Sequence, residues 1–518
     1  MKRRGSLKAL GIIGLQAMLP PFGVAQGASS FGASPPFDTS VIVDLANGTP
    51  ANARLCGSNV QWVDGGDGLL STSGTAFALG IVDKVKQLSP TVIRYPGGSQ
   101  SDVFHWQAGV GEEAARATCE HFHRKDKQIV RFGTGEFLAL CAATGAEALI
   151  TANVATGTPE EAAAWVRLTN VTRLRRPGSS ETLPCVKFWE LGNEPYLKED
   201  MRPETWMAPE DYARKADAFM RAMRKVDPSI QIGLPLRSDT FNGIPVTPHQ
   251  GFNQRVLATL RERFDFVSLH DAYLPFLYDK APGDDEIYAA LMGASRTVEL
   301  DLEATRNQLK KIWGRTLPLA ITEYNALVTL GRRQDGYLSS PAGALYVADL
   351  LRLFAQQSDV LMANHWSLIG NWEFGALTTR GSARPVFEVL RGFRSVLRGQ
   401  MARLVIQSKV FSTPRVGLIQ EASGLSVVTG IATLEADRLR LVLINKDPKA
   451  ESQTMIALQS GHISAVRDIQ SLVASKPFAS ANDLASLARR TVKGELSSNG
   501  CALLLPPASM TTLEFAVG

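Results

Sequence analysis

From about residue 54 to residue 395, short apolar segments alternate with segments of helical periodicity. Strand candidates separated by helices are typical of repeated βα units around a parallel sheet. Eight strand candidates can be distinguished, at residues 54–62, 91–98, 146–156, 186–195, 230–236, 264–273, 317–325 and 360–368. Eight such units over roughly 340 residues match a (β/α)8 barrel with insertions, so we expect an α/β fold of this type.

Several expected helices carry start and stop signals. Thr158 followed by Pro159 is typical of a helix N-terminus, because the threonine hydroxyl can cap the first turn and proline fits the first helical position. Gly145 follows the segment EFLALCAAT in the way a C-terminal glycine does. Residues 173–184 and 282–286 are expected to be loops by their Pro and Gly content.

The pattern changes at about residue 396, after which short strand-like runs alternate with turns. This texture predicts an all-β region, although residues 464–488 are helix-like and have no place in it. The segment FDTSVIVDL (37–45) is one more strand candidate, and a lone strand is not stable, so we expect it to join the C-terminal sheet. The expected domains are an N-terminal strand segment (31–49), a (β/α)8 barrel (50–395) and a β-sandwich (396–518).

Residues 1–30 have the three regions of an export signal, with Lys and Arg first, then an apolar stretch, then small residues. The pair Arg3-Arg4 followed by Ser6-Leu7-Lys8 favours a twin-arginine signal over a general secretory signal. We therefore expect a periplasmic or secreted protein. No apolar run is long enough to span a membrane, so no membrane association is expected after signal removal.

The charge balance gives no reason to expect a nucleic-acid partner. The chain has 55 Lys and Arg against 50 Asp and Glu, but residues 1–37 contain four of the basic residues and no acidic ones, which leaves 51 against 50. No GxGxxG or GxxxxGK[ST] loop is present, so no nucleotide cofactor is expected. The five cysteines are an odd number without CxxC spacing, and we expect all of them to be small buried residues.

Four residues between positions 105 and 123 are of metal-binding types: His105, Cys119, His121 and His123. The spacing HFH is not that of a helical ligand pair, and a long barrel loop is a sufficient account of these residues. We therefore expect no metal site and no cofactor.

Polar side chains gather at the ends of the strand candidates, where a (β/α)8 barrel places its active groups. Glu194 follows the fourth candidate and Glu323 ends the seventh, so two carboxylates would face each other across one barrel mouth, while Glu190 lies inside its strand and is expected to be structural. The other polar or aromatic groups at strand ends include Arg94, Asn153, Asn193, His270, Tyr273 and Trp366. Glycoside hydrolysis needs such a pair of carboxyls, and polar and aromatic neighbours suit a polyhydroxylated ring.

The order of these residues resembles clan A of the glycoside hydrolases, which are retaining (β/α)8 enzymes with an Asn-Glu acid/base after the fourth strand and a Glu nucleophile after the seventh. Three segments resemble family 51, the α-L-arabinofuranosidases: VIRYPGG (92–98), the run from Gly133 to Val166, and VKFWELGNE (186–194). The resemblance covers residues 85–375, and with its C-terminal β-sandwich it extends to most of the remaining chain.

The resemblance implies a role for each strand-end residue. Glu194 would be the general acid/base and Glu323 the nucleophile. The remaining implied roles are Arg94 and Tyr273 holding the nucleophile, Asn193 binding the hydroxyl next to the anomeric carbon, His270 and Trp366 shaping the sugar subsite, and Asn153 lining it.

Two features depart from family 51. His270 and Tyr273 are one residue further apart than in the usual His-x-Tyr, and alternating strand side chains would then face opposite ways. Pro195 and the motif TEYN (322–325) resemble family 79, the β-glucuronidases and heparanase-like enzymes. A uronic acid would need a cationic or amide-rich pocket for its carboxylate, for which Arg237 is a candidate.

We therefore expect an exported retaining glycosidase that acts on carbohydrate side chains, with α-L-arabinofuranoside as the first choice of substrate. The alternatives are a β-glucuronidase or another clan A glycosidase, and a sugar-binding protein without catalysis.

Overall fold

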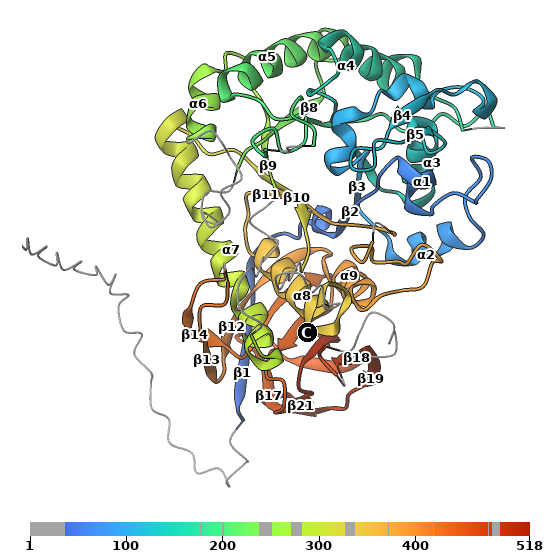
Figure 1. Cartoon of the computed structure of the whole chain (residues 1–518). Coiled ribbons are helices and arrows are strands. Elements are labelled where there is room, and N and C mark those ends of the chain that lie inside the picture. The colour runs from blue at the N-terminus through green and yellow to red at the C-terminus, as the bar shows by residue number, and fades with distance from the viewer. Residues whose placement is uncertain are drawn as a thin grey trace, which may run out of the picture. The chain divides into compact units, whose positions relative to one another are not determined.

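The computed structural model describes residues 37–176, 179–198, 201–237, 251–270, 282–326, 337–370, 372–417, 419–474, 476–478 and 487–518 (Figure 1). Residues 37–518 form one compact unit. The predicted export signal lies outside the described residues. Within the described part of the chain, no helix combines the length and the apolar composition that a membrane span requires.

Eight parallel strands close into a barrel, which confirms the predicted (β/α)8 fold. In order around the barrel they are β2 (Gly57–Asn59), β3 (Val92–Tyr95), β6 (Glu147–Ala152), β7 (Phe188–Leu191), β8 (Gln231–Pro235), β9 (Phe266–Leu269), β10 (Leu319–Tyr324) and β11 (Val360–His365). Each lies within one of the eight predicted strand segments. The barrel closes where β11 pairs with β2, at the pairs Asn364–Gly57 and His365–Ser58.

Helices follow the strands and cover the barrel (Figure 1). They are α1 (Val63–Asp67), α2 (Ile81–Leu88), α3 (Thr134–Thr144), α4 (Pro159–Val166), α5 (Pro209–Val226), α6 (Phe252–Thr259), α7 (Asp284–Trp313), α8 (Pro341–Ala355) and α9 (Pro385–Val396). Shorter turns of helix are η1 (Ala53–Cys56), η2 (Gly98–Val103), η3 (Trp106–Gly109), η4 (Glu113–Ala115), η5 (Arg167–Thr172) and η7 (Tyr337–Ser339). The predicted caps are confirmed, because Thr158 Oγ1 accepts a hydrogen bond from the backbone N–H of Glu161 at 3.1 Å and Gly145 ends α3 with φ of 73°.

One predicted loop is partly helix. Residues 282–286 were expected to form a loop, but α7 begins at Asp284. Asp284, Asp285 and Glu286 occupy its first turn, where the helix dipole favours negative charge. Acidic residues after Pro-Gly were therefore the start of a helix and not the end of a loop.

The C-terminal strands form one ten-stranded sheet. Its order is β19 (Leu487–Thr491), β18 (Ile463–Ala474), β22 (Ser509–Val517), β16 (Arg438–Asn445), β15 (Val428–Glu435), β12 (Gln400–Gln407), β1 (Thr39–Pro50), β17 (Ser452–Leu458), β21 (Gly500–Leu505) and β20 (Gly494–Ser497). Two hairpins lie apart from it, β13 (Val410–Thr413) with β14 (Ala422–Ser426) and β4 (Thr118–Glu120) with β5 (Lys127–Ile129).

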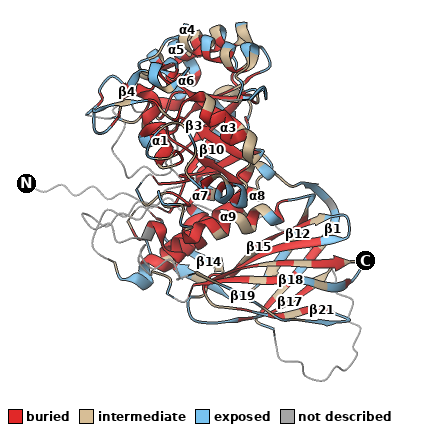
Figure 2. Cartoon of the chain, turned by 90° about the vertical axis from the view of Figure 1, so that its right-hand side faces the viewer, coloured by how far each residue is buried: buried red, intermediate tan, exposed pale blue. Residues whose placement is uncertain are grey.

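The sheet folds over a core of its own. β18 lies near one end of the strand order and contacts β20 and β21 at the other end. The core between the strands includes Val41, Leu441 and Phe515, and Figure 2 shows buried residues along these strands. β1 pairs with β12 and β17, which confirms that the strand before the barrel joins the C-terminal sheet.

The helix-like interpretation of residues 464–488 is wrong. β18 covers Ile463–Ala474 and pairs with β22, and β19 begins at Leu487, while residues 479–486 lie outside the described residues. The pairing of β18 shifts register twice, near residues 464 and 467. Such bulges break the period-two alternation of a strand, so the apolar spacing in the sequence imitated a helix.

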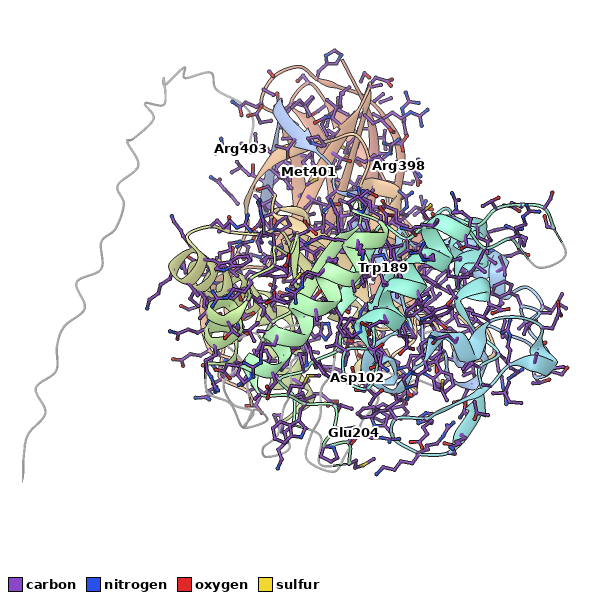
Figure 3. All side chains as sticks on the ribbon, turned by 90° about the horizontal axis from the view of Figure 1, so that it is seen from above. Asp102, Trp189, Glu204, Arg398, Met401 and Arg403 are labelled. Carbon is purple, nitrogen blue, oxygen red and sulfur yellow. The ribbon has the colours of Figure 1, made fainter. Side chains whose placement is uncertain are left out.

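The barrel and the sheet share a second, larger core. It includes Leu345 of α8, Phe393 of α9, Val442 of β16 and Met510 of β22. Figure 3 marks Trp189 in the barrel strand β7 and Met401 in the sheet strand β12. The barrel is therefore supported by the sheet on the side of α8 and α9.

Candidate active site

The backbone after β7 turns sharply and presents Glu194 to a cavity. Gly192 has φ of 82° and Glu194 has φ of 45°, so both are in the left-handed region. Glycine adopts this region freely, but it is uncommon for glutamate and is found where surrounding structure enforces it. The N–H of Gly192 donates to the carbonyl of Ala152 at 2.9 Å, which ties the turn to the neighbouring strand β6.

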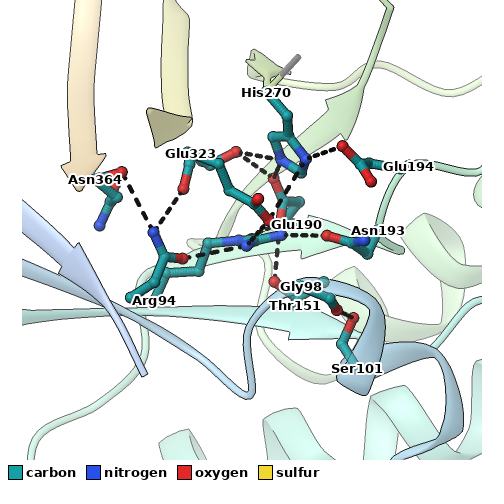
Figure 4. A network of polar contacts seen from close by, with 12 residues as sticks. Arg94, Gly98, Ser101, Thr151, Glu190, Asn193, Glu194, His270, Glu323 and Asn364 are labelled. Carbon is teal, nitrogen blue, oxygen red and sulfur yellow. Dashed lines mark hydrogen bonds and ion pairs between the residues drawn. The ribbon is translucent and has the colours of Figure 1, made fainter. Parts of the chain in front are cut away.

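Glu323 comes from β10 and reaches the same point. A carboxylate oxygen of Glu194, one of Glu323 and a ring nitrogen of His270 all lie within 4.8 Å of one another. Figure 4 shows the two carboxylates on either side of the His270 ring. The structure therefore brings together the two glutamates that the sequence placed 129 positions apart.

Arg94, on β3, is fully buried and connects the residues that follow β7 with Glu323 of β10. Its guanidinium donates to Glu323 Oε1 at 2.8 Å and to Asn193 Oδ1 at 3.0 Å. It also donates to Glu190 Oε2 through Nε at 2.7 Å and to Asn59 Oδ1 at 3.2 Å. Four acceptors on three strand segments thus fix one planar cation, as the fork geometry of arginine allows.

The pKa values of Glu323 and Glu190 are shifted in opposite directions. Burial raises the pKa of Glu323, and the nearby Glu194 adds to this, whereas His270 and Arg94 oppose it. Burial would also raise the pKa of Glu190, but Arg94 and His270 outweigh it and hold that pKa well below its ordinary value. Glu190 points into the barrel interior, so the prediction that it is structural agrees with its position.

His270 directly follows β9 and lies between the carboxylates. Its Nδ1 is 3.4 Å from Glu194 Oε1 and 3.6 Å from Glu323 Oε1, and its Nε2 is 2.7 Å from Thr322 Oγ1. Burial would lower its pKa, but Glu323, Glu190 and Glu194 raise it to about 10. The ring is therefore an imidazolium at neutral pH. His270 is buried and is not among the described residues that line the cavity, so its expected contact with sugar stays a prediction.

Asn193 is held on two sides. Its Oδ1 accepts from Arg94, and its backbone N–H donates to Asp102 Oδ1 at 3.4 Å. Asp102 is buried, and burial together with Glu194 raises its pKa well above the ordinary value although the bond from Asn193 opposes this. With Oδ1 engaged by Arg94, Asn193 lines the cavity.

Trp366 lies against the start of η2. A Cβ added at Gly98 would approach the Trp366 ring to 2.5 Å, and Gly98 has φ of 58°, so glycine is required there on both counts. Asn325 Nδ2 donates to the carbonyl of Trp366 and, at 3.2 Å, to that of Phe374. These contacts fix the aromatic ring at the cavity wall.

The cavity has a volume of about 1060 Å³. Its lining includes Glu194, Glu323, Asn193 and Trp366, together with Asp64, Asp67, His121, His123, Arg124, Arg131 and Trp372. This volume is at the upper end of the roughly 300–1,000 Å³ that is typical of sites for drug-sized ligands. The cavity therefore has room for more than a single pentose.

Two expected site residues stand apart from this group. Asn153 is not among the described residues that line the cavity, so its expected contact with sugar is not supported. Its Nδ2 donates to the Phe104 carbonyl at 3.1 Å and to Thr156 Oγ1 at 2.9 Å, which fastens the loop that carries Asp102. Tyr273 lies outside the described residues, and its contact with the nucleophile stays a prediction.

Glu194, His270 and Glu323 are the group of donor atoms in the described chain that could share a metal ion by distance. The positive charges of Arg94 and His270 disfavour a metal ion at this point. Arg94 already contacts Glu323, and the His270 imidazolium has no free lone pair for a cation. Of the earlier metal candidates, His105 Nδ1 lies 3.1 Å from Glu161 and the Cys119 thiol has a pKa raised by burial to about 11.

Sequence reasoning missed Asn59, Asp102 and Thr322. Asn59 Nδ2 donates to the carbonyls of Thr322 at 2.9 Å and His365 at 3.2 Å, so it joins β2 to β10 and β11 beneath Arg94. Its place at the end of the first strand was a signal that could have been used. Asp102 offered no such signal, because it reaches Asn193 from η2, outside the strands. The expectation of five buried cysteines is wrong at Cys185, which is exposed.

Residues 84–254 match the family model described as "Alpha-L-arabinofuranosidase 1 domain". Alpha-L-arabinofuranosidase C of Emericella nidulans is 36% identical over 175 residues, or 33% of this chain and 34% of that one. The chain thus matches about a third of the length of this curated relative. The exo-alpha-(1->6)-L-arabinofuranosidase of Bifidobacterium longum is 23% identical over 519 residues, which are 90% of this chain and 94% of that one.

Among solved structures, a family 51 alpha-L-arabinofuranosidase from Bifidobacterium longum superposes with a TM-score of 0.76 at 19% identity, covering 93% of this chain and 100% of that one. This likeness establishes the fold. None of these matches supports family 79. Residues 84–254 thus resemble the α-L-arabinofuranosidase 1 domain, and the chain has the fold of the family 51 structure.

Proposed function

We propose that the protein is a retaining glycoside hydrolase that releases terminal α-L-arabinofuranosyl groups from carbohydrate side chains. The observation that carries the proposal is the spacing of Glu194 and Glu323, whose carboxylate oxygens lie within 4.8 Å beside one cavity. Retaining enzymes hold their two carboxyl groups about 5–5.5 Å apart, whereas inverting enzymes need about 6.5–9.5 Å to admit a water molecule.

The surroundings of the two glutamates distinguish their roles. Glu323 forms an ion pair with the buried Arg94, which fixes its carboxylate and favours the ionised form that a nucleophile needs. Glu194 has no arginine partner among the described residues, and its side chain is more exposed, at 18% against 11%. Glu194 can therefore exchange protons with a leaving group and with water.

The reaction then proceeds in two steps. Glu323 attacks the anomeric carbon and forms a glycosyl ester while Glu194 donates its proton to the leaving oxygen. Water next attacks the same carbon as Glu194 takes its proton, and the ester bond to Glu323 breaks. Asn193 would donate Nδ2 to the neighbouring sugar hydroxyl, and Trp366 would pack against the ring.

The choice of sugar follows from the relatives and from the cavity. The matched family model and the relatives are named for α-L-arabinofuranosides. Arg237, which was the candidate for binding a uronic acid, is not among the described cavity-lining residues. Arg124 and Arg131 do line the cavity, but Arg124 is paired with Asp64 and Asp126, and Arg131 donates to the backbone carbonyls of Ser71 and Gly74. An arabinofuranoside therefore fits better than a glucuronide.

A panel of nitrophenyl glycosides tests this proposal. Turnover should be highest with the α-L-arabinofuranoside. Glu323→Ala should abolish turnover, whereas Glu194→Ala should retain turnover of this activated aryl glycoside and be accelerated by azide, an anionic nucleophile that attacks the glycosyl ester without a general base and gives a glycosyl azide. Heat of sugar binding in calorimetry with no turnover of any panel member would instead indicate a sugar-binding protein.

We also infer that the protein is exported to the periplasm or beyond. Residues 1–30 have the form of an export signal, and the paired arginines favour the twin-arginine route. Replacement of Arg3 and Arg4 by lysine should retain the protein in the cytoplasm of a bacterial host. Normal export of that variant would indicate a general secretory signal.

A further inference from the structure

Glu190 is a third carboxylate beneath the proposed catalytic pair, and the reaction does not use it. It is fully buried and is not among the described residues that line the cavity. It accepts hydrogen bonds from Arg94 Nε at 2.7 Å, Thr151 Oγ1 at 2.8 Å and Thr322 Oγ1 at 2.8 Å. A buried carboxylate is costly unless it is paired in this way, so a group retained there requires an explanation.

The Thr322 hydroxyl fixes the direction of the hydrogen bonds around it. A hydroxyl has one proton, and Thr322 donates it to Glu190 Oε1. An ionised carboxylate has no proton to return. The contact of 2.7 Å between Thr322 Oγ1 and His270 Nε2 must therefore be a donation from the imidazole. This assigns a proton to Nε2 of His270.

The opposite ring nitrogen faces the reaction. His270 Nδ1 lies 3.4 Å from Glu194 Oε1 and 3.6 Å from Glu323 Oε1. The described charged groups around the ring are Glu190, Glu194, Glu323 and Arg94, and the carboxylates raise the His270 pKa to about 10 against the effect of burial. Nδ1 therefore also carries a proton at neutral pH and directs it between the two glutamates (Figure 4).

We propose that Glu190 and Thr322 are positioning residues, which hold the His270 imidazolium with its Nδ1–H directed between Glu194 and Glu323. The consequence for the reaction rests on the proposed function. The imidazolium offsets the effect of burial on Glu323 and keeps the nucleophile ionised before attack. After Glu194 has given up its proton, the same Nδ1–H stabilises the carboxylate that must next activate water. The hydrogen bonds that link Glu190, Thr322 and His270 transfer no net proton.

Thr322→Val tests this link between Glu190 and His270, because it removes one hydroxyl and leaves every charge in place. The His270 Nε2–H would lose its acceptor at 2.7 Å and keep only Glu190 Oε1 at 3.5 Å, and a hydrogen bond to a charged group corresponds to a pKa change of about one to two units. We expect the His270 pKa to fall by this amount and the acidic limb of the kcat/KM profile to move to higher pH. Thr322→Ser restores the hydroxyl and should restore both.

The readout is ¹⁵N NMR of histidine-labelled protein across pH, with His270→Gln to assign the signal. In the wild type both ring nitrogens should stay protonated well into the alkaline range. A wild-type ring that titrates near the ordinary value of about 6.5 overturns the inference without any variant. So does a Thr322→Val protein whose His270 titration is unchanged. The His270 titration can be measured whether or not the protein is active. An inactive wild type would therefore refute the proposed function without deciding the positioning of His270.

Discussion

Arg94→Lys tests whether one buried guanidinium organises the active site. Lysine keeps the positive charge but replaces five N–H donors by three from one point, so it cannot reach Glu323, Asn193 and Glu190 together. The variant should lose the bonds of 2.8 Å to Glu323 and 3.0 Å to Asn193, since Glu190 offers two contacts, at 2.7 and 2.6 Å.

The expected loss can be worked from these two bonds. A hydrogen bond to a charged group contributes about 1.5–3 kcal/mol and a typical one about 0.5–1.5 kcal/mol. A combined loss of about 3 kcal/mol lowers kcat/KM about 10²-fold. Glu323 would also lose a contact that opposes the effect of burial on its pKa, so the acidic limb of the pH profile should move to higher pH.

The assay is kcat/KM for nitrophenyl α-L-arabinofuranoside as a function of pH. Arg221→Lys is the matched control, because Arg221 forms an exposed pair with Glu262 at 3.3 Å and such pairs contribute little. If Arg94→Lys stays within about threefold of the wild type and its acidic limb does not move, the guanidinium does not hold the nucleophile.

Three further outcomes follow from the described contacts. Asp349 lies between the barrel and the sheet and bonds Lys446 Nζ at 2.7 Å, so Asp349→Asn should lower the free energy of unfolding in urea by about 3 kcal/mol at neutral pH. Burial would raise the Asp349 pKa, but Arg352 and Lys446 hold it below its ordinary value. The contribution is therefore present above the unfolded value of about 3.9 and is lost as pH falls, and a difference that persists in acid contradicts this account. Trp372 lines the cavity and is 55% exposed, so Trp372→Ala should raise KM for arabino-oligosaccharides severalfold more than for the nitrophenyl glycoside, and equal effects would exclude it as a platform for the leaving group. Cys185 is the one exposed cysteine of five, so native protein should react rapidly at one thiol, and Cys185→Ser at none.

The barrel could be predicted because each strand obeys a local rule. Strands such as β7 and β10 are short, apolar and end in polar residues, and these ends necessarily share one face of a parallel barrel. The pairing of Glu194 with Glu323 follows from that topology alone. Features set by local backbone chemistry, such as the Thr158 cap, could be predicted equally well.

What could not be predicted depends on contacts between distant segments. The bulges of β18 are set by its pairing with β22. They give the apolar residues of this strand a spacing that resembles that of a helix. Asn153 has the expected strand-end position, but its amide is engaged by a loop whose path the sequence does not specify. Glu190 was identified as structural, yet its connection to His270 through Thr322 becomes visible only when β7, β9 and β10 surround the same barrel interior.

The stereochemistry of transfer tests the central claim most directly. Hydrolysis of nitrophenyl α-L-arabinofuranoside in the presence of methanol gives a methyl arabinofuranoside, which does not interconvert between anomers. If Glu323 forms a glycosyl ester and Glu194 activates the acceptor, ¹H NMR should show the α-anomer alone. Formation of the β-anomer would mean a single displacement, and would contradict the roles assigned to the two glutamates.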